Sequence, residues 1–258
     1  MLLAIDIGNT SIAFGVYKNR ELSAHFRLGT IKGRGVDEYA VFLTSLLASK
    51  GIAFGDIKAV IISSVVPPVL EIIREVCKES LEIDPLVIGE NVDSGIQVLY
   101  DNPKEVGADR IVNAVAGYDK YHQSLIIIDF GTATTFDCVS QNGEYLGGVI
   151  SPGIAISAEA LFQRTSKLPR VDILKPTTAI GKNTIASMQS GLFFGYVSLV
   201  EGMVKRIEME MQSSPLVIAT GGQAELISNG TDVIKHVEPH LTLEGLRLIY
   251  ERSRKTDS

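Results

Sequence analysis

The chain has 258 residues, of which 45% are hydrophobic and 21% charged, a composition typical of soluble globular proteins. Its 24 basic and 30 acidic side chains give a net charge of −6, so no overall positive field attracts nucleic acid or an anionic membrane. The longest apolar stretches are far shorter than the roughly 20 residues that cross a bilayer. We therefore expect neither a nucleic-acid partner nor a membrane span.

Cysteine and histidine usage bears on metal sites and on the cell compartment. The only cysteines, Cys77 and Cys138, stand in separate halves of the chain, and the four histidines are dispersed. Neither a CxxC nor an HExxH spacing is present, so we expect no structural zinc site. Isolated cysteines are typical of reduced thiols, and the first residues indicate a strand rather than a signal peptide. A cytoplasmic protein is therefore predicted.

The first half of the chain alternates between strand and helix patterns, which predicts an α/β layer with a partly parallel sheet. A proline pair ends the strand pattern over 58–66, and the turn-rich stretch 89–110 is expected to carry substrate contacts. The apolar stripe of the first helix consists of Tyr39, Phe42, Leu43, Leu46 and Leu47. The predicted elements are a hairpin over 2–17, a helix over 36–52, a strand over 58–66, a helix over 68–83, a strand over 84–89 and a helix from about 108 to 118.

The second half begins with another strand and contains one long amphipathic helix. No segment of flexible linker composition separates the halves, so we expect two tightly packed lobes, 1–120 and 121–258. The predicted elements are a strand from 125, strands over 133–139 and 144–150, a helix near 155–163, a loop over 169–184, a helix over 186–211 and a strand from 215.

The two halves share a sequence repeat. Residues 2–17 (LLAIDIGNTSIAFGVY) align without gaps on residues 125–140 (LIIIDFGTATTFDCVS), so that Asp6 matches Asp129 and Gly8 matches Gly131. Each copy has a buried strand, a carboxylate, a glycine turn and a returning strand. Asp and Gly are also common in ordinary turns, but two copies in the same register favour related lobes that face each other across a cleft.

These turns carry the residue types that a nucleotide polyphosphate and its metal ion require. Glycine permits close approach of the backbone to phosphate oxygens, and the carboxylates of Asp6 and Asp129 are suited to a divalent ion, directly or through water. Further donors are expected from Asn9, Thr10, Ser11, Thr132 and Thr134.

A third glycine element follows the strand that starts near 215. Thr220-Gly221-Gly222 precedes a helix pattern, and its glycines would let adenine or ribose lie against the backbone. A plain strand-to-helix turn is the alternative, and this motif alone is a weak signal.

The segment GADR, residues 107–110, supplies candidates for catalysis. Asp109 could orient an attacking hydroxyl and accept its proton, Arg110 could pair with an acidic substrate group, and Gly107 would admit a close ligand. An acidic helix start with a surface arginine explains the same residues, and the residues alone leave the two interpretations open.

Other nucleotide and hydrolase motifs are missing. GKNT at 181–184 lacks the hydroxyl residue directly after lysine and the upstream glycine of a Walker A loop, so we expect Thr184 to be a helix N-cap. No GxGxxG follows a strand, and no GxSxG elbow is present.

The combination of DIGNTSIAFGVY, GADR, DFGTATTFD, GGVISPG and ATGG resembles the type III pantothenate kinases over essentially the whole chain. The resemblance implies a duplicated ribonuclease H-like fold of the actin-like and sugar-kinase ATPase superfamily, with two lobes of mixed sheets flanked by helices. It also implies a homodimer that phosphorylates pantothenate with ATP to 4'-phosphopantothenate, the first step of coenzyme A biosynthesis. The implied cofactors are Mg²⁺ and a monovalent cation, K⁺ or NH₄⁺.

The resemblance also implies roles for single residues. Asp109 is the implied catalytic base, Asp6 lies near magnesium, and Asp129 binds the monovalent cation. The implied ATP contacts are Asp6, Ile7, Gly8, Asn9, Thr10, Ser11, Ile12, Ala13 and Thr132. The implied substrate contacts are Tyr100, Gly107, Ala108, Asp109, Arg110 and Thr184.

Two other functions remain as alternatives. A catalytically silent nucleotide-binding regulator would keep the fold, but the intact Asp6, Asp109 and Asp129 argue against it. A phosphatase or ATPase of the same superfamily would release ADP or phosphate without pantothenate. The helix over 186–211 is the expected place of dimerisation. Thr184 would reach the partner's site if the dimer buries the pantothenate site, and the sequence leaves open whether it acts there or in its own chain.

Overall fold

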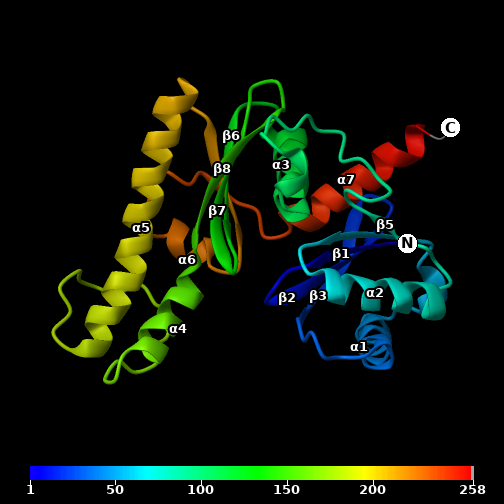
Figure 1. Cartoon of the computed structure of the whole chain (residues 1–258), viewed down its shortest axis with the longest axis horizontal. Helices are drawn as coiled ribbons and strands as arrows, with labels where there is room; N and C mark the ends of the chain where they lie inside the picture. Colours follow the sequence, from blue (N-terminus) through cyan, green and yellow to red (C-terminus); the bar gives the residue numbers. More distant parts are fainter. Residues whose placement is uncertain (257–258) are drawn as a thin grey trace. The chain divides into compact units, whose positions relative to one another are not determined.

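The computed structural model describes residues 1–256, which form two compact units (Figure 1). The first unit consists of residues 1–96, residues 101–116 and the C-terminal segment from Leu241. The second consists of Gln97–Tyr100 and Gly117–His240. The units are therefore not continuous in sequence, unlike the predicted lobes 1–120 and 121–258. The physical reason is that helix α7 (Leu241–Thr256) packs on strands of the first unit's sheet.

The first unit is built on a five-stranded sheet with the order β3-β2-β1-β4-β5. The first three strands are antiparallel, whereas β4 pairs in parallel with β1 and β5 in parallel with β4. The strands are β1 (Leu2–Ile7), β2 (Ser11–Lys18), β3 (Glu21–Gly29), β4 (Ala59–Ser64) and β5 (Leu86–Val87). The helices are α1 (Val36–Ser49), α2 (Pro67–Ser80), α3 (Ala108–Tyr121) and α7, with short 3₁₀ turns at Phe54–Asp56 and Pro103–Glu105.

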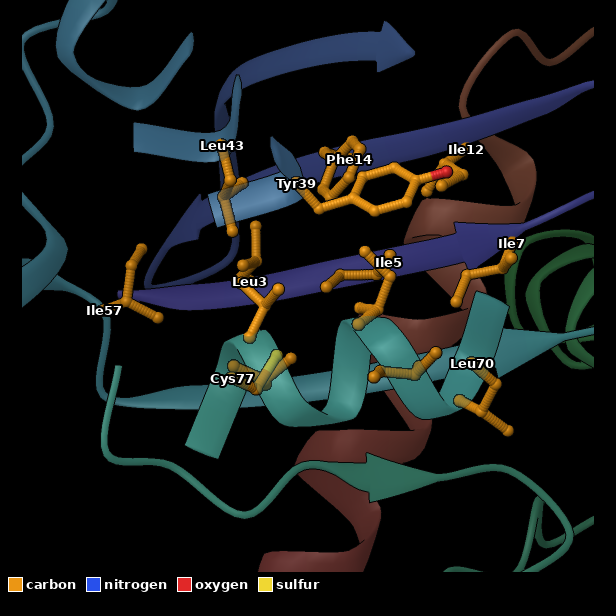
Figure 2. Close-up of a cluster of buried hydrophobic side chains, with 14 of the residues drawn as sticks. Leu3, Ile5, Ile7, Ile12, Phe14, Tyr39, Leu43, Ile57, Leu70 and Cys77 are labelled. Atoms are coloured by element: carbon orange, nitrogen blue, oxygen red, sulfur yellow. The ribbon is translucent and has the colours of Figure 1, made fainter. Parts of the chain in front are cut away.

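Both faces of this sheet are covered. Helices α1 and α2 cover one face, and α7 with the start of α3 covers the other (Figure 1). Figure 2 shows the first core, where Leu3, Ile5 and Ile7 of β1 lie among side chains of α1 and α2. Each is fully buried, which stabilises the fold by roughly 1.5–3 kcal/mol per side chain. Ala4 packs on the opposite face, so the alternation along β1 places Asp6 on the α3–α7 face.

Helix α1 buries a narrower stripe than the one predicted. Tyr39, Leu43 and Leu47 recur every fourth residue and are buried, whereas Phe42 is 40% exposed. Phe42 lies instead beneath the guanidinium of Arg34, whose central carbon is 4.4 Å from the ring centroid. A cation–π contact of this kind accounts for an aromatic side chain outside the core.

The second unit repeats the topology of the first. Its strand order is β10-β9-β6-β7-β8, with β6, β7 and β8 antiparallel and with β9 and β10 continuing in parallel. The order and directions match those of the first unit, so the predicted duplication of a ribonuclease H-like fold is confirmed. The strands are β6 (Leu125–Phe130), β7 (Ala133–Val139), β8 (Tyr145–Pro152), β9 (Leu216–Gly221) and β10 (His236–Val237). The helices are α4 (Ile154–Arg164), α5 (Thr184–Met211) and α6 (Ala224–Ser228).

Helices also cover both faces of the second sheet. Helices α4, α5 and α6 pack on one face (Figure 1). The last turns of α3 lie on the other, where an added Cβ on Gly117 would be 2.8 Å from the Ile127 side chain. The end of α3 is held where the Tyr121 hydroxyl donates to Glu238 Oε1 at 2.5 Å. Within residues 1–256, no helix is both long enough and apolar enough to span a membrane.

Candidate active site

The first glycine turn joins β1 to β2 and is braced by the end of β3. The pairing of Ile7 with Ile12 leaves a four-residue loop, in which the Gly8 N–H donates to the Ser11 carbonyl at 3.1 Å. The Thr30 hydroxyl donates to the Gly8 carbonyl at 2.7 Å, and the Thr30 N–H donates to the Thr10 carbonyl at 3.0 Å. The loop is therefore held by two backbone hydrogen bonds and by the Thr30 hydroxyl.

The predicted ATP segment Asp6–Ala13 divides into exposed and buried side chains. Asn9 and Thr10 are exposed at the turn, while Ile7 and Ile12 have no exposed surface because they belong to the α1–α2 core. Only the backbone of these isoleucines is available to a ligand. The turn thus exposes the polar side chains of Asn9 and Thr10, while the buried Ile7 and Ile12 anchor its two ends in the core.

Asp6 is the acid at the end of β1. It is half-buried, and Ser63 of the adjacent β4 donates its hydroxyl to Asp6 Oδ1 at 2.6 Å. The pKa of Asp6 is raised to about 7, mainly by burial; the Ser63 hydrogen bond opposes this rise, and the negative charge of Asp109 adds to it. Asp6 and Asp109 therefore lie close enough to repel each other, although more than a hundred residues separate them.

Asp109 lies in the first turn of α3, folded back over Gly107. An added Cβ on Gly107 would be 2.6 Å from Asp109 Oδ1 and 3.5 Å from the Val65 side chain. The backbone N–H of Arg110 donates to Asp109 Oδ1 at 2.8 Å. Burial raises the pKa of the Asp109 carboxyl, whereas this N–H and the Arg110 charge hold it down. The glycine of GADR is thus needed to make room for the acid.

Arg110 is not a surface residue. It is 8% exposed, and Ala108 beside it packs with the α7 core. Asp109 does stand in the first turn of α3, as the alternative of an acidic helix start has it, but the surface arginine of that alternative is wrong. A buried guanidinium is costly unless its charge is paired and hydrogen-bonded.

The second glycine turn, between β6 and β7, is one residue shorter than the first. Phe130 pairs with Thr134, and the Gly131 N–H donates to the Ala133 carbonyl at 3.0 Å. Thr132 is exposed at the tip, and its carbonyl accepts from the Gly153 N–H at 3.1 Å. The turn is braced from outside, as the first one is.

Thr134 does not serve as a donor at this turn, contrary to prediction. Its side chain has no exposed surface and lies on the same face of β7 as Phe136, toward the second unit's core. Among the described residues its hydroxyl has no hydrogen-bond partner. The shorter loop is the reason, since a one-residue change in a hairpin reverses the faces of the returning strand.

Asp129 is the counterpart of Asp6 in the second unit. It stands in register with Thr135 of β7 and Thr220 of β9, so all three lie on one face of the sheet. Gly221 has a φ of +92°, and an added Cβ there would be 2.5 Å from Asp129 Oδ1. The Phe130 carbonyl oxygen would be 2.6 Å from the same Cβ, so the positive φ and the Phe130 backbone require the glycine, and Asp129 adds to the crowding.

The remaining predicted substrate contacts, Tyr100 and Thr184, lie in the second unit. Tyr100 ends a segment that pairs with β8, and its ring lies 3.6 Å from the position of a Cβ on Gly147. Thr184 is exposed at the first residue of α5. It is not the N-cap, because the Asn183 side chain accepts the Ala186 N–H at 2.9 Å.

Thr184 also lines an open groove of about 1060 Å³ between α4 and α5. Arg164, Lys182 and Tyr196 line the same groove. Gly107, Ala108, Asp109 and Arg110, in contrast, belong to the first unit.

The acids of the first unit fit a metal that is also held by phosphate. No three or more His, Cys, Asp or Glu side chains within residues 1–256 are grouped so that they alone could hold a metal ion. Magnesium, however, is usually bound by one or two carboxylates together with phosphate oxygens and water. The repulsion between Asp6 and Asp109 would be relieved by a cation near them. The oxygen donors therefore suit Mg²⁺.

Ser63 is the site residue that the sequence analysis missed. The available signal was a pair of serines at the end of the apolar strand KAVIISS, beside the strand that carries Asp6. A hydroxyl at the end of a buried parallel strand lies where ligands usually bind in open α/β sheets.

The chain is similar to known proteins over its full length. A family model described as type III pantothenate kinase matches residues 2–206. Type III pantothenate kinases from Pelobacter propionicus and Geobacter sulfurreducens are 54% and 53% identical, over 98% and 99% of this chain and 100% of each relative.

Solved structures show the same fold at low identity. A Baf family protein from Campylobacter jejuni matches with a TM-score of 0.64 and 19% identity, covering 98% of this chain and 99% of that one. The ROK hexokinase from Thermus thermophilus matches with a TM-score of 0.52 and 14% identity, over 98% and 99%. The fold is thus that of the sugar-kinase and actin-like ATPases.

Proposed function

The chain belongs to the type III pantothenate kinase family and phosphorylates pantothenate with ATP in coenzyme A biosynthesis, and we propose that Asp109 and Asp6 carry the chemistry of this transfer. The observation that carries the proposal is that the negative charge of Asp109, which folds over Gly107, raises the pKa of Asp6 in the same unit. Phosphoryl transfer needs a carboxylate at the attacking hydroxyl and charge neutralisation at the phosphates.

Asp109 is the proposed general base. The hydroxyl oxygen of pantothenate bonds to the γ-phosphorus of ATP, the bond from that phosphorus to the bridging oxygen of ADP breaks, and the hydroxyl proton passes to Asp109. Burial raises the pKa of Asp109, which makes it a better proton acceptor than an exposed aspartate. The backbone N–H of Arg110 binds Oδ1 of Asp109 and leaves Oδ2 for the substrate.

The polar residues of the two turns are the proposed nucleotide contacts. Asn9, Thr10 and Ser11 supply donors from the first turn, and Thr132 supplies one from the second. Asp6 is the proposed Mg²⁺ ligand, directly or through water. Magnesium, when bound, would neutralise charge on the phosphates.

Asp129 is the proposed ligand of a monovalent cation, K⁺ or NH₄⁺. Its support is the carboxylate's position against the Gly221 backbone, with Thr135 and Thr220 on the same face of the sheet. These groups offer oxygen atoms, which are the ligands that alkali cations accept.

Tyr100, Gly107–Arg110 and Thr184 are the proposed pantothenate contacts, with Arg110 and Thr184 at the carboxylate end. We further propose a homodimer whose interface includes the α4–α5 groove, because large apolar side chains are exposed around it. These are Ile156, Leu161, Phe162, Ile180 and Ile185. A cytoplasmic location is supported by Cys77 and Cys138, which are buried free thiols.

A coupled assay of ADP release tests the proposed function. Release should require pantothenate, and it should be faster in K⁺ or NH₄⁺ than in Na⁺ alone. Equal release without pantothenate would indicate an ATPase or phosphatase. Nucleotide binding without any release would indicate a regulator.

The dimer proposal has a separate test. Thr184→Ala and Asp109→Asn proteins are each expected to be weakly active, and mixing them should restore activity if Thr184 completes the partner's site. Absence of restoration in a confirmed mixed dimer would assign Thr184 to the site of its own chain.

A further inference from the structure

Asp6 has one short hydrogen bond to a neighbouring strand. In the parallel pairing of β1 with β4, Asp6 stands opposite Ser63, and the Ser63 hydroxyl donates to Asp6 Oδ1 at 2.6 Å. Ser63 has no exposed surface, so water does not replace this donor. Hydrogen bonds to an ionised acceptor are stronger than neutral ones and fix the acceptor's orientation.

We propose that Ser63 is a positioning residue for the metal-binding carboxylate of Asp6. This inference rests on the proposed role of Asp6 at magnesium. By engaging Oδ1, the hydroxyl sets the rotation of the carboxylate and leaves Oδ2 for the metal or for its bound water. Residues that orient a metal ligand in this way typically change metal affinity or activity 10–100-fold when they are removed.

The composition of β4 supports a specific role for this hydroxyl. The preceding residues Val60, Ile61 and Ile62 are buried and apolar, so a serine among them loses packing area and must satisfy its hydroxyl. The adjacent Ser64 has a different partner, since its hydroxyl accepts the Val66 N–H at 3.1 Å just before α2. The two serines therefore divide their tasks, and only Ser63 contacts a functional acid.

The second unit has the same arrangement. Asp129 stands opposite Thr220 of β9, as Asp6 stands opposite Ser63 of β4, and Thr220 is 3% exposed. Both copies of the duplicated fold thus place a buried hydroxyl residue beside the acid that follows the first strand. Local packing differs between the two units, so the repeated pairing indicates that the hydroxyl residue is there because of the acid.

The test compares Ser63→Ala with Ser63→Thr, which keeps the hydroxyl. Ser190→Ala is the matched control. Ser190 lies in α5 of the other unit, is also buried, and donates its hydroxyl hydrogen bond to the Ala179 carbonyl. Mn²⁺ binding is measured by electron paramagnetic resonance with a non-hydrolysable ATP analogue. The Mg²⁺ dependence of kcat/KM is measured in parallel.

Ser63→Ala should weaken Mn²⁺ binding about 10–100-fold and raise the Mg²⁺ requirement by a similar factor. Its KM for pantothenate should change little. Ser63→Thr should recover most of the affinity, and Ser190→Ala should match the wild type. Wild-type Mn²⁺ affinity in Ser63→Ala, or a failure of Ser63→Thr to recover affinity, would overturn the inference.

An Asp6→Asn variant separates the proposed role of Asp6 at the metal from the proposed role of Ser63. Wild-type Mn²⁺ affinity in Asp6→Asn would remove Asp6 from the metal site and so contradict the proposed function. Weak binding in Asp6→Asn with normal binding in Ser63→Ala would overturn only the role of Ser63. If Ser63→Ala does not fold, Ser63→Cys keeps the volume with a weak donor and is judged by the same outcomes.

Discussion

The two units share one topology but end their central parallel strands differently. Beside Asp6, β4 ends in Ser63-Ser64, and the Val65 that follows packs close to Gly107. Beside Asp129, β9 ends in Thr220-Gly221, where the glycine leaves room for the carboxylate itself. The first unit therefore fills the space around its acid and holds it by a hydroxyl. In the second unit the corresponding space is taken by the Asp129 carboxylate itself.

This difference is consistent with different proposed roles for the two copies of the duplicated fold. In the first unit the negative charge of Asp109 raises the pKa of Asp6, so two carboxyls influence each other where phosphoryl transfer is proposed. In the second unit Asp129 stands beside Thr135 and Thr220, and the carboxyl of Asp137 accepts a hydrogen bond from Thr135, so oxygen atoms surround the proposed cation site. Under the proposed function, the same starting hairpin supports phosphoryl transfer in one copy and cation binding in the other.

The largest expected effect comes from filling the space beside Asp129. Gly221→Ala forces a side chain into a backbone with positive φ, against the Phe130 backbone and the Asp129 carboxylate, so the free energy of unfolding should fall by about 1–3 kcal/mol. Activation by K⁺ should be lost as well. Denaturant unfolding and K⁺ titration of the rate measure both effects.

Gly222→Ala is the matched control for this experiment. A Cβ at Gly222 would meet no described atom within 4 Å, so this variant should keep both stability and K⁺ activation. Equal losses in the two variants would mean that Gly221 acts through the general flexibility of the turn and not through Asp129.

The sequence predicted the duplication well because hydrophobic runs and glycine turns are local signals. It failed at Thr134, since an ungapped alignment matches Thr134 with Ser11, whereas the second loop is one residue shorter and turns Thr134 toward the core. It did not predict that the C-terminal segment returns to the first unit, because the packing of α7 on the first sheet depends on contacts distant in sequence.

The catalytic acid illustrates the same limit. Residues 107–110 alone were compatible with a surface helix start, and only the resemblance to a kinase family favoured chemistry for Asp109. The structure adds a physical reason for that role, because the charge of Asp109 acts on Asp6. Helix and strand periodicity reports only on neighbouring residues, so it does not predict this proximity. The Ser63 partner was missed for the same reason.

A second prediction concerns the stability of the metal-free protein. Burial raises the pKa of Asp6 to about 7, above its ordinary value near 4, so the folded state binds more protons than the unfolded state between these pH values. Stability from this group is therefore present at low pH and is lost as pH rises through about 7. Asp6→Asn should raise Tm at pH 8 but not at pH 4, by about 2–4 °C for each kcal/mol gained.

Thermal unfolding without metal or nucleotide, at several pH values, measures this effect. Asp172→Asn removes an exposed carboxyl of the second unit and controls for the change in net charge. A Tm difference for Asp6→Asn that is the same at pH 4 and pH 8 would contradict a raised pKa.

The smallest expected effect is at Thr134. Its buried hydroxyl lacks a partner among the described residues, so Thr134→Val should leave stability unchanged or raise it by about 1 kcal/mol. Thr135→Val, on the opposite face, removes a hydroxyl that donates to Asp137 and should destabilise. Calorimetry of the two variants compares them, and a clear loss of stability in Thr134→Val would show that its hydroxyl is satisfied in solution.

The division of work between the units is tested most directly by K⁺ titrations of the kinase rate in Asp109→Asn and Asp129→Asn. Asp109→Asn should lower kcat about 10²–10⁴-fold while the K⁺ concentration for half-maximal activity stays unchanged. Asp129→Asn should instead raise that K⁺ concentration at least about tenfold, or abolish the response to K⁺. An unchanged K⁺ response in Asp129→Asn, or full activity in Asp109→Asn, would contradict the account.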